Sequence, residues 1–137
     1  MPNKKIKNAT PVEIDGIKFR SKLESKVAKL LKDEDIPYQY EPFKIQYIPK
    51  FNYLETTYRA AYYTPDFVID NKFIIECKGW QNDVWRYKKK LVLLQLINQN
   101  YKYDFYEINT ITQMKNWIKS YKDGTIKKYQ ESIETSS

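Results

Sequence analysis

Three charged side chains have the types and the spacing that hydrolytic metal chemistry requires. Asp66 follows a proline and precedes an apolar run, and Glu76 and Lys78 close a second apolar run. Alternate side chains of a strand share one face, so Glu76 and Lys78 point the same way. If the two runs form a hairpin that turns near 70–71, Asp66 lies opposite residues 75–77. The sequence therefore predicts two carboxylates and an ammonium group on one surface.

Two neighbouring carboxylates repel each other, and a hard cation such as Mg²⁺ removes that repulsion. Asp66 and Glu76 are the expected ligands, with the backbone carbonyl of Cys77 as a further oxygen donor. Lys78 would orient or help to deprotonate a water molecule and stabilise charge on a phosphate. The alternative for a single Glu-x-Lys pattern is a surface ion pair. The Pro-Asp start and the Glu-x-Lys-Gly end together favour the catalytic interpretation.

The composition narrows the chemistry further. The chain has no histidine, which excludes histidine-ligated metals and catalytic triads with a histidine base. Its single cysteine, Cys77, excludes an intrachain disulfide and suits a reducing compartment. Because Cys77 lies on the strand face opposite to Glu76 and between apolar residues, we expect a small core side chain without chemistry of its own.

The balance of charge points to an acidic partner. The chain has 24 lysines and arginines against 17 acidic residues, a net charge of +7, and 13 tyrosines. Basic groups beside aromatic rings suit contacts with nucleic acid, although most of the rings are alternatively core residues. No segment approaches the roughly 18 unbroken apolar residues of a membrane span, and the N-terminus lacks a secretion signal. We expect a soluble, intracellular protein.

Apolar periodicity predicts the elements that would position these groups, in an α/β fold with a mixed central β-sheet flanked by helices. In chain order we expect a helix from Ser21 to about Asp35, an extended segment at 38–47, an irregular connection at 48–62, strands at 67–69 and 73–78, a helix at 82–99, a strand at 101–108 and a helix at 112–121. The expected domain is 16–121, between a flexible basic arm at 1–15 and a polar tail at 122–137.

Glu24 has two interpretations. Ser21-x-x-Glu24 matches a capping box, in which the glutamate bonds back to the start of its helix. A glutamate on a helix also completes a metal site in some enzymes. The local pattern alone favours the cap.

The segments FRSKLESKVAKLL, YQYE, YTPDFVI and FIIECKGW resemble the phage endonuclease I family, part of the PD-(D/E)xK nuclease superfamily, which resolves four-way DNA junctions. The resemblance covers roughly 19–47 and 62–90. It implies a restriction-endonuclease-like fold, with Glu24, Asp66 and Glu76 around Mg²⁺ or Mn²⁺ and Lys78 as the catalytic lysine. Glu24 thereby becomes a catalytic and metal-binding candidate.

The resemblance also implies the partners. The family acts on branched DNA as an intertwined homodimer, so Glu24 of one chain would meet the other site residues of a second copy. The connection 45–63 is longer than is usual in the family and rich in tyrosine. The candidate phosphate-binding residues, which alternatively are solvated surface charges, are Lys4, Lys5, Lys7, Arg20, Lys22, Arg86, Lys88, Lys89 and Lys90.

Two other functions stay open beside junction resolution. Relatives of this fold include nicking or homing endonucleases that choose a sequence, and a long tyrosine-rich insertion suits that purpose. A DNA-binding module without catalysis is the other possibility, and the complete set of Asp66, Glu76 and Lys78 argues against it.

Overall fold

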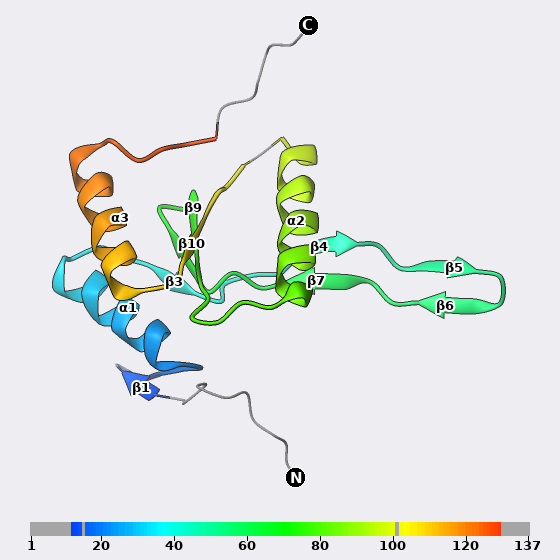
Figure 1. Ribbon diagram of the computed structural model, residues 1–137, viewed down its shortest axis with the longest axis horizontal. Coiled ribbons are helices and arrows are strands. Elements are labelled where there is room, and N and C mark those ends of the chain that lie inside the picture. The colour runs from blue at the N-terminus through cyan, green and yellow to red at the C-terminus, as the bar shows by residue number, and fades with distance from the viewer. Residues whose placement is uncertain (1–11, 15, 101, 130–137) are drawn as a thin grey trace, which may run out of the picture.

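The computed structural model describes residues 12–14, 16–100 and 102–129, and it is a mixed α/β structure built on a central sheet (Figure 1). The elements in chain order are β1 (Val12–Ile14), β2 (Ile17–Phe19), α1 (Lys22–Asp33), β3 (Gln39–Tyr40), β4 (Ile45–Ile48), β5 (Phe51–Tyr53), β6 (Thr56–Tyr58), β7 (Ala61–Tyr63), β8 (Phe67–Ile69), β9 (Phe73–Cys77), α2 (Asp83–Asn98), β10 (Asp104–Ile108) and α3 (Ile111–Asp123). The predicted helices and the strands after residue 66 are therefore confirmed, with small shifts at their ends.

The central sheet has the strand order β10-β9-β8-β3. Strands β8 and β9 form the predicted antiparallel hairpin, with Phe67 opposite Ile75. Its turn places Asp70 and Asn71 at positive φ values of 59° and 51°, a conformation that these two residue types tolerate well. Strand β10 runs parallel to β9 and is reached through α2. Parallel strands need such a crossover, so the sequence order strand, helix, strand is explained.

Helices cover both faces of this sheet, α1 and α3 on one side and α2 on the other (Figure 1). Alternation along β9 divides its side chains between two cores. Ile75 packs with Val27 of α1 and Met114 of α3, whereas Ile74 packs with Val92 of α2. Cys77 belongs to the α1 and α3 side and is buried, as expected for a core residue.

Each helix begins at a polar side chain that accepts a hydrogen bond from its first turn. Ser21, Asn82 and Thr110 are the N-caps of α1, α2 and α3. Such caps satisfy backbone N–H groups that have no partner within the helix. Helix α3 ends at Gly124, whose φ of 73° suits a residue without a Cβ atom.

The expectation of an irregular connection at 48–62 is wrong. Strand β4 pairs with β7, and β5 pairs with β6, so the connection is a long two-stranded ribbon. It extends away from the sheet, past α2 (Figure 1). The ribbon carries the chain out and back, so that β3 and β8 pair within one chain, with Tyr40 opposite Phe67.

The ends of the predicted domain can be compared with the structure only in part. Within the predicted arm, β1 pairs with β2. Within the predicted tail, the backbone N–H of Tyr129 donates to Asp104 at 3.1 Å. Lys4, Lys5 and Lys7 and residues 130–137 lie outside the described residues. In the described ranges, every helix is too short or too polar to cross a membrane.

Candidate active site

Asp66 and Glu76 are neighbours at one end of the β8–β9 hairpin. Continuing the register of Phe67 opposite Ile75 places Asp66 opposite Glu76. One carboxylate oxygen of Asp66, Oδ2, accepts a hydrogen bond from the backbone N–H of Cys77 at 2.7 Å, which fixes its side chain across the hairpin. Both side chains are buried, with Asp66 8% and Glu76 5% exposed. The hairpin thus brings together the two predicted carboxylates.

Lys78 is the third member of the predicted group. Its Nζ lies 3.7 Å from Oε2 of Glu76, and its side chain is 30% exposed. The backbone of Lys78 is held on β10, because its N–H donates to the carbonyl of Ile108 at 2.9 Å. The ammonium group therefore faces both a buried carboxylate and solvent, where a charged substrate can reach it.

Glu24 both takes part in a cap and stands next to the other carboxylates. Its backbone N–H donates to Ser21 Oγ at 3.2 Å, as in a capping box. Its Oε1 accepts from the N–H of Arg20 at 3.3 Å and from the hydroxyl of Tyr40 at 2.6 Å. Both recorded bonds use Oε1, so Oε2 is the oxygen that can bind an ion. The two interpretations of Glu24 are thus compatible.

The electrostatics show that the three carboxylates of one chain share a neighbourhood. Burial, followed by repulsion from Glu76 and Glu24, raises the pKa of Asp66 well above its ordinary value. Burial also raises the pKa of Glu76 to about 7, and repulsion from Glu24 acts in the same direction. Bonding from Tyr63 and the charges of Lys78 and Lys88 oppose this rise. An ion between the carboxylates would relieve these penalties.

A divalent cation is compatible with this donor set. Among the described residues, no three acidic or thiol side chains converge closely enough to hold an ion by themselves. Mg²⁺ is usually bound through one or two carboxylates, with water and substrate phosphates completing its shell. Asp66 and Glu76 satisfy that requirement. Ligation by Glu24 and by the carbonyl of Cys77 remains a prediction.

Tyr63 is a site residue that the sequence analysis missed. Its hydroxyl donates to Glu76 Oε1 at 2.5 Å. Burial and the adjacent charge of Glu76 raise the pKa of this phenol, so it stays a donor at neutral pH. Tyr63 belongs to β7 at the base of the ribbon, and its place beside the site depends on the fold of the whole connection. No local motif reveals it.

Trp85 and Glu107 hold Lys78 from the side of α2. The Nζ of Lys78 lies 4.3 Å from the centroid of the Trp85 ring, a cation–π contact. The indole Nε1 of Trp85 donates to Oε1 of Glu107 at 3.1 Å. Glu107 is directly opposite Glu76 in the β9–β10 register. This chain of contacts restricts the position of the ammonium group.

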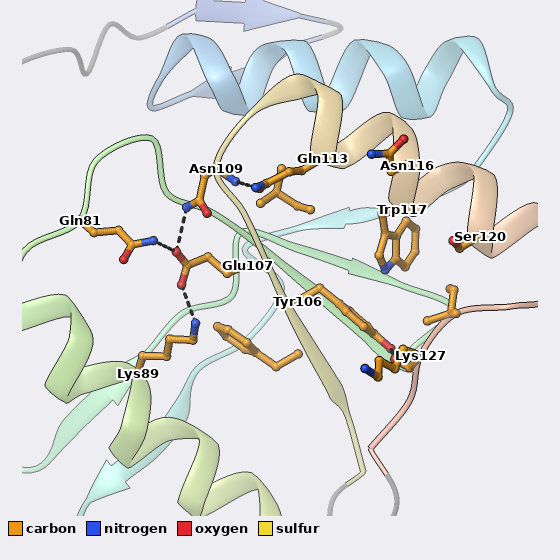
Figure 2. Close-up of a pocket in the computed structure, with 13 residues that line it drawn as sticks. Gln81, Lys89, Tyr106, Glu107, Asn109, Gln113, Asn116, Trp117, Ser120 and Lys127 are labelled. Carbon is orange, nitrogen blue, oxygen red and sulfur yellow. Dashed lines mark hydrogen bonds and ion pairs between the residues drawn. The ribbon is translucent and has the colours of Figure 1, made fainter.

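Glu107 is itself held by a ring of donors, which Figure 2 shows. Lys89 Nζ bonds to its Oε1 at 2.8 Å, while Asn109 at 2.8 Å and Gln81 bond to its Oε2. Burial alone would raise the pKa of Glu107, but hydrogen bonds from its neighbours outweigh it and lower the pKa. The adjoining pocket of about 570 Å³ lies between α2 and α3 and does not include the three catalytic candidates. Glu107 therefore stays ionised and positions Trp85.

The predicted phosphate-binding residues within the described ranges have varied surroundings. Lys88 lies over the rings of Tyr47 and Tyr63, close to the carboxylates. Lys89 is engaged with Glu107, as described above. The others are exposed, with Arg20 paired to Glu41, Arg86 paired to Asp83, Lys90 over the ring of Tyr87, and Lys22 in the first turn of α1. Their role in DNA binding remains a prediction.

Comparison with known proteins gives a consistent result. A family profile described as "Phage endonuclease I" matches residues 5–130, so the chain belongs to the phage endonuclease I family. The chain is 42% identical over 67 residues to "Endonuclease I" of Escherichia phage T7, a match that covers 47% of this chain and 40% of the relative. It is 43% identical over 70 residues to "Endodeoxyribonuclease 1" of Enterobacteria phage T3, covering 50% of this chain and 41% of the relative.

These matches set the limits of the likeness. The matched part spans about two fifths of the length of each relative. No solved structure matches the chain. The family and the mixed α/β architecture are thereby established, and the activity is addressed below.

Proposed function

We propose that the chain is a divalent-metal-dependent DNA endonuclease of the PD-(D/E)xK fold, which resolves four-way junctions and other branched DNA by paired nicks. The observation that carries the proposal is the pair of buried carboxylates, Asp66 and Glu76, on adjacent strands with the Lys78 ammonium group 3.7 Å from Glu76. Membership of a family of phage endonucleases supports it. The curated relatives are named as endonucleases, which favours DNA as the substrate.

Each side chain has a distinct part in this proposal. Asp66 and Glu76 would hold Mg²⁺ or Mn²⁺, with Glu24 as a third carboxylate. When bound, the ion supplies an activated water molecule and neutralises charge on the phosphodiester. Lys78 binds the phosphate oxygens electrostatically and stabilises the charge that develops on them. Tyr63 and Trp85 fix the orientation of Glu76 and Lys78, so that both face the substrate.

A second copy of the chain is part of the proposal. Paired nicks require two sites, and an intertwined homodimer supplies them by exchanging the segment before the 45–63 connection. Glu24 would then meet Asp66, Glu76 and Lys78 of the partner copy. Analytical ultracentrifugation distinguishes this dimer from a monomer by mass. If the phage origin of the relatives holds for this chain, the site of action is the cytoplasm of an infected cell.

One assay tests the activity. The purified chain is incubated with Mg²⁺ and a labelled four-way junction, or with a linear duplex of the same sequence. We expect paired cuts near the branch point and loss of cutting in Glu76→Ala. Glu13→Ala, which changes an exposed glutamate of β1, is the matched control. Cuts at one linear sequence would instead support a homing or nicking enzyme, and binding without metal-dependent cuts would leave a DNA-binding module.

A further inference from the structure

The outer part of the ribbon, formed by β5 and β6 and called the finger below, has two chemically different faces. Phe51 pairs with Tyr58, and Tyr53 pairs with Thr56. Alternation places these three aromatic side chains on one face. The opposite face carries Asn52 and Thr57, which are joined by a hydrogen bond of 2.7 Å. The finger is therefore an amphipathic β-hairpin of 51–58.

The aromatic face is exposed. Phe51, Tyr53 and Tyr58 are 46%, 64% and 45% exposed, although a β-hairpin normally buries such a face. The rings of Phe51 and Tyr58 stack on each other at 5.0 Å with an angle of 14° between their planes. Neither core of the described residues includes any residue of 51–58. Isolated two-stranded hairpins are marginal in water, and exposed aromatic patches are typical of binding surfaces.

The tip of the finger is apolar and strained. Leu54 is 84% exposed and has a φ of 56°, in the left-handed region. Glycine or asparagine would occupy that conformation at lower cost. A strained residue that gains nothing from packing indicates a functional constraint. Leucine is one of the side chains that proteins insert between stacked bases.

The charges beside the finger favour a nucleic acid over a second copy of the chain. Lys50 and Arg59 flank it and are exposed, and Lys44 lies 6.0 Å from the ring centroid of Tyr62. Glu55 is the only acidic residue from 44 to 59. Two fingers placed against each other would bring these basic groups together. Basic groups beside exposed rings match a phosphate backbone and its bases.

The finger is also continuous with the candidate active site. The strand that returns from it, β7, ends at Tyr63, whose hydroxyl binds Glu76. Lys88 of α2 spans the base of the ribbon, over Tyr47 and Tyr63. A DNA strand with a phosphate at Glu76 would therefore lie along the direction of the ribbon.

We propose that the finger is a wedge for distorted DNA. Its aromatic face stacks on bases that have left the duplex, and Leu54 inserts between base steps beside them. The proposal rests on the proposed function only in that DNA is the ligand. It adds a source of selectivity for branched or bulged DNA over regular duplex, at a distance from the catalytic carboxylates.

Binding without cleavage tests the wedge. The full chain is titrated, in EDTA, with a duplex that carries an unpaired bulge with 2-aminopurine and with the matched regular duplex. Stacking contributes about 1–3 kcal/mol per base, equivalent to roughly 5-fold to 150-fold in affinity. We expect Tyr53→Ser with Tyr58→Ser, and separately Leu54→Asn, to lose a factor in that range on the bulged DNA and less than about twofold on the duplex. The change in 2-aminopurine fluorescence should diminish with it.

The controls decide between the explanations. Asn52→Ser, on the polar face, should bind both DNAs like the unchanged chain, and circular dichroism shows whether each variant folds. Equal losses on both DNAs, or no loss, would overturn the wedge. Variants that become monomeric while keeping their preference for the bulge would also overturn it, and would assign the finger to self-association. Because the assay needs no metal, failure of cleavage and failure of the wedge are separate results.

Discussion

Glu76→Gln should stabilise the metal-free protein above neutral pH. Burial raises the pKa of Glu76 from an ordinary 4.5 to about 7, so the folded state holds a proton that the unfolded state releases. This contribution to stability is complete below pH 4.5 and is lost as the pH rises to about 7 and beyond. At about 1.4 kcal/mol for each tenfold change in proton affinity, the loss is about 3 kcal/mol. Glutamine keeps an oxygen for the Tyr63 hydroxyl and has no charge to bury.

The measurement is urea unfolding in EDTA at several values between pH 4.5 and 8. The free energy of unfolding of Glu76→Gln, relative to the unchanged chain, should increase by about 3 kcal/mol over this range. Glu13→Gln changes an exposed carboxylate and should show no such trend. A relative stability that does not depend on pH would refute the reasoning, because the buried charge would then cost nothing.

Adding Mg²⁺ extends the same test to the metal. A cation that binds the ionised pair stabilises the folded state by about 2.7 kcal/mol at one hundred times its dissociation constant. We expect this gain at pH 8 in the unchanged chain and its loss in Glu76→Gln. An equal gain in both proteins would place the ion elsewhere.

Three further substitutions have direct readouts. Tyr63→Phe removes a hydrogen bond that lowers the pKa of Glu76, so the acid limb of the pH profile of Mg²⁺-dependent cleavage should move to higher pH. Glu107→Gln weakens the support of Trp85 beneath Lys78, and should lower kcat about 10-fold to 100-fold with KM little changed in steady-state cleavage. Phe67→Ala empties a fully buried site between α1 and the sheet, and should cost about 3–5 kcal/mol in urea unfolding.

The predictable parts of the fold are those in which local pattern and packing agree. The helix from Lys22 has an apolar stripe and a serine cap, and the β8–β9 hairpin has two turn residues that accept positive φ. The strands of the finger have the alternation of a hairpin, but their apolar face is not buried, and their turn contains Leu54 in place of glycine or asparagine. Periodicity and turn chemistry therefore gave no clear signal there, and the connection was wrongly predicted as irregular.

The site divides in the same way. The proximity of Asp66, Glu76 and Lys78 follows from two rules, alternation along a strand and pairing across a turn. The contacts of Tyr63 with Glu76 and of Trp85 with Glu107 join elements that are distant in the sequence. They depend on how the ribbon and α2 pack against the sheet, which the spacing of residues does not encode. Burial of the carboxylates, which determines their pKa values, likewise requires the complete fold.

The ribbon reconciles a site formed within one chain with the proposed intertwined dimer. The exchangeable segment, which includes Glu24 and β3, connects to the rest of the chain only through the two strands that meet at the turn of Leu54 and Glu55. If that turn opened, β4 and β5 could pair with β7 and β6 of a second copy in the same registers. Every contact around Asp66 would be kept, and the positive φ of Leu54 would be relieved. The two assemblies therefore differ at the finger and not at the carboxylates.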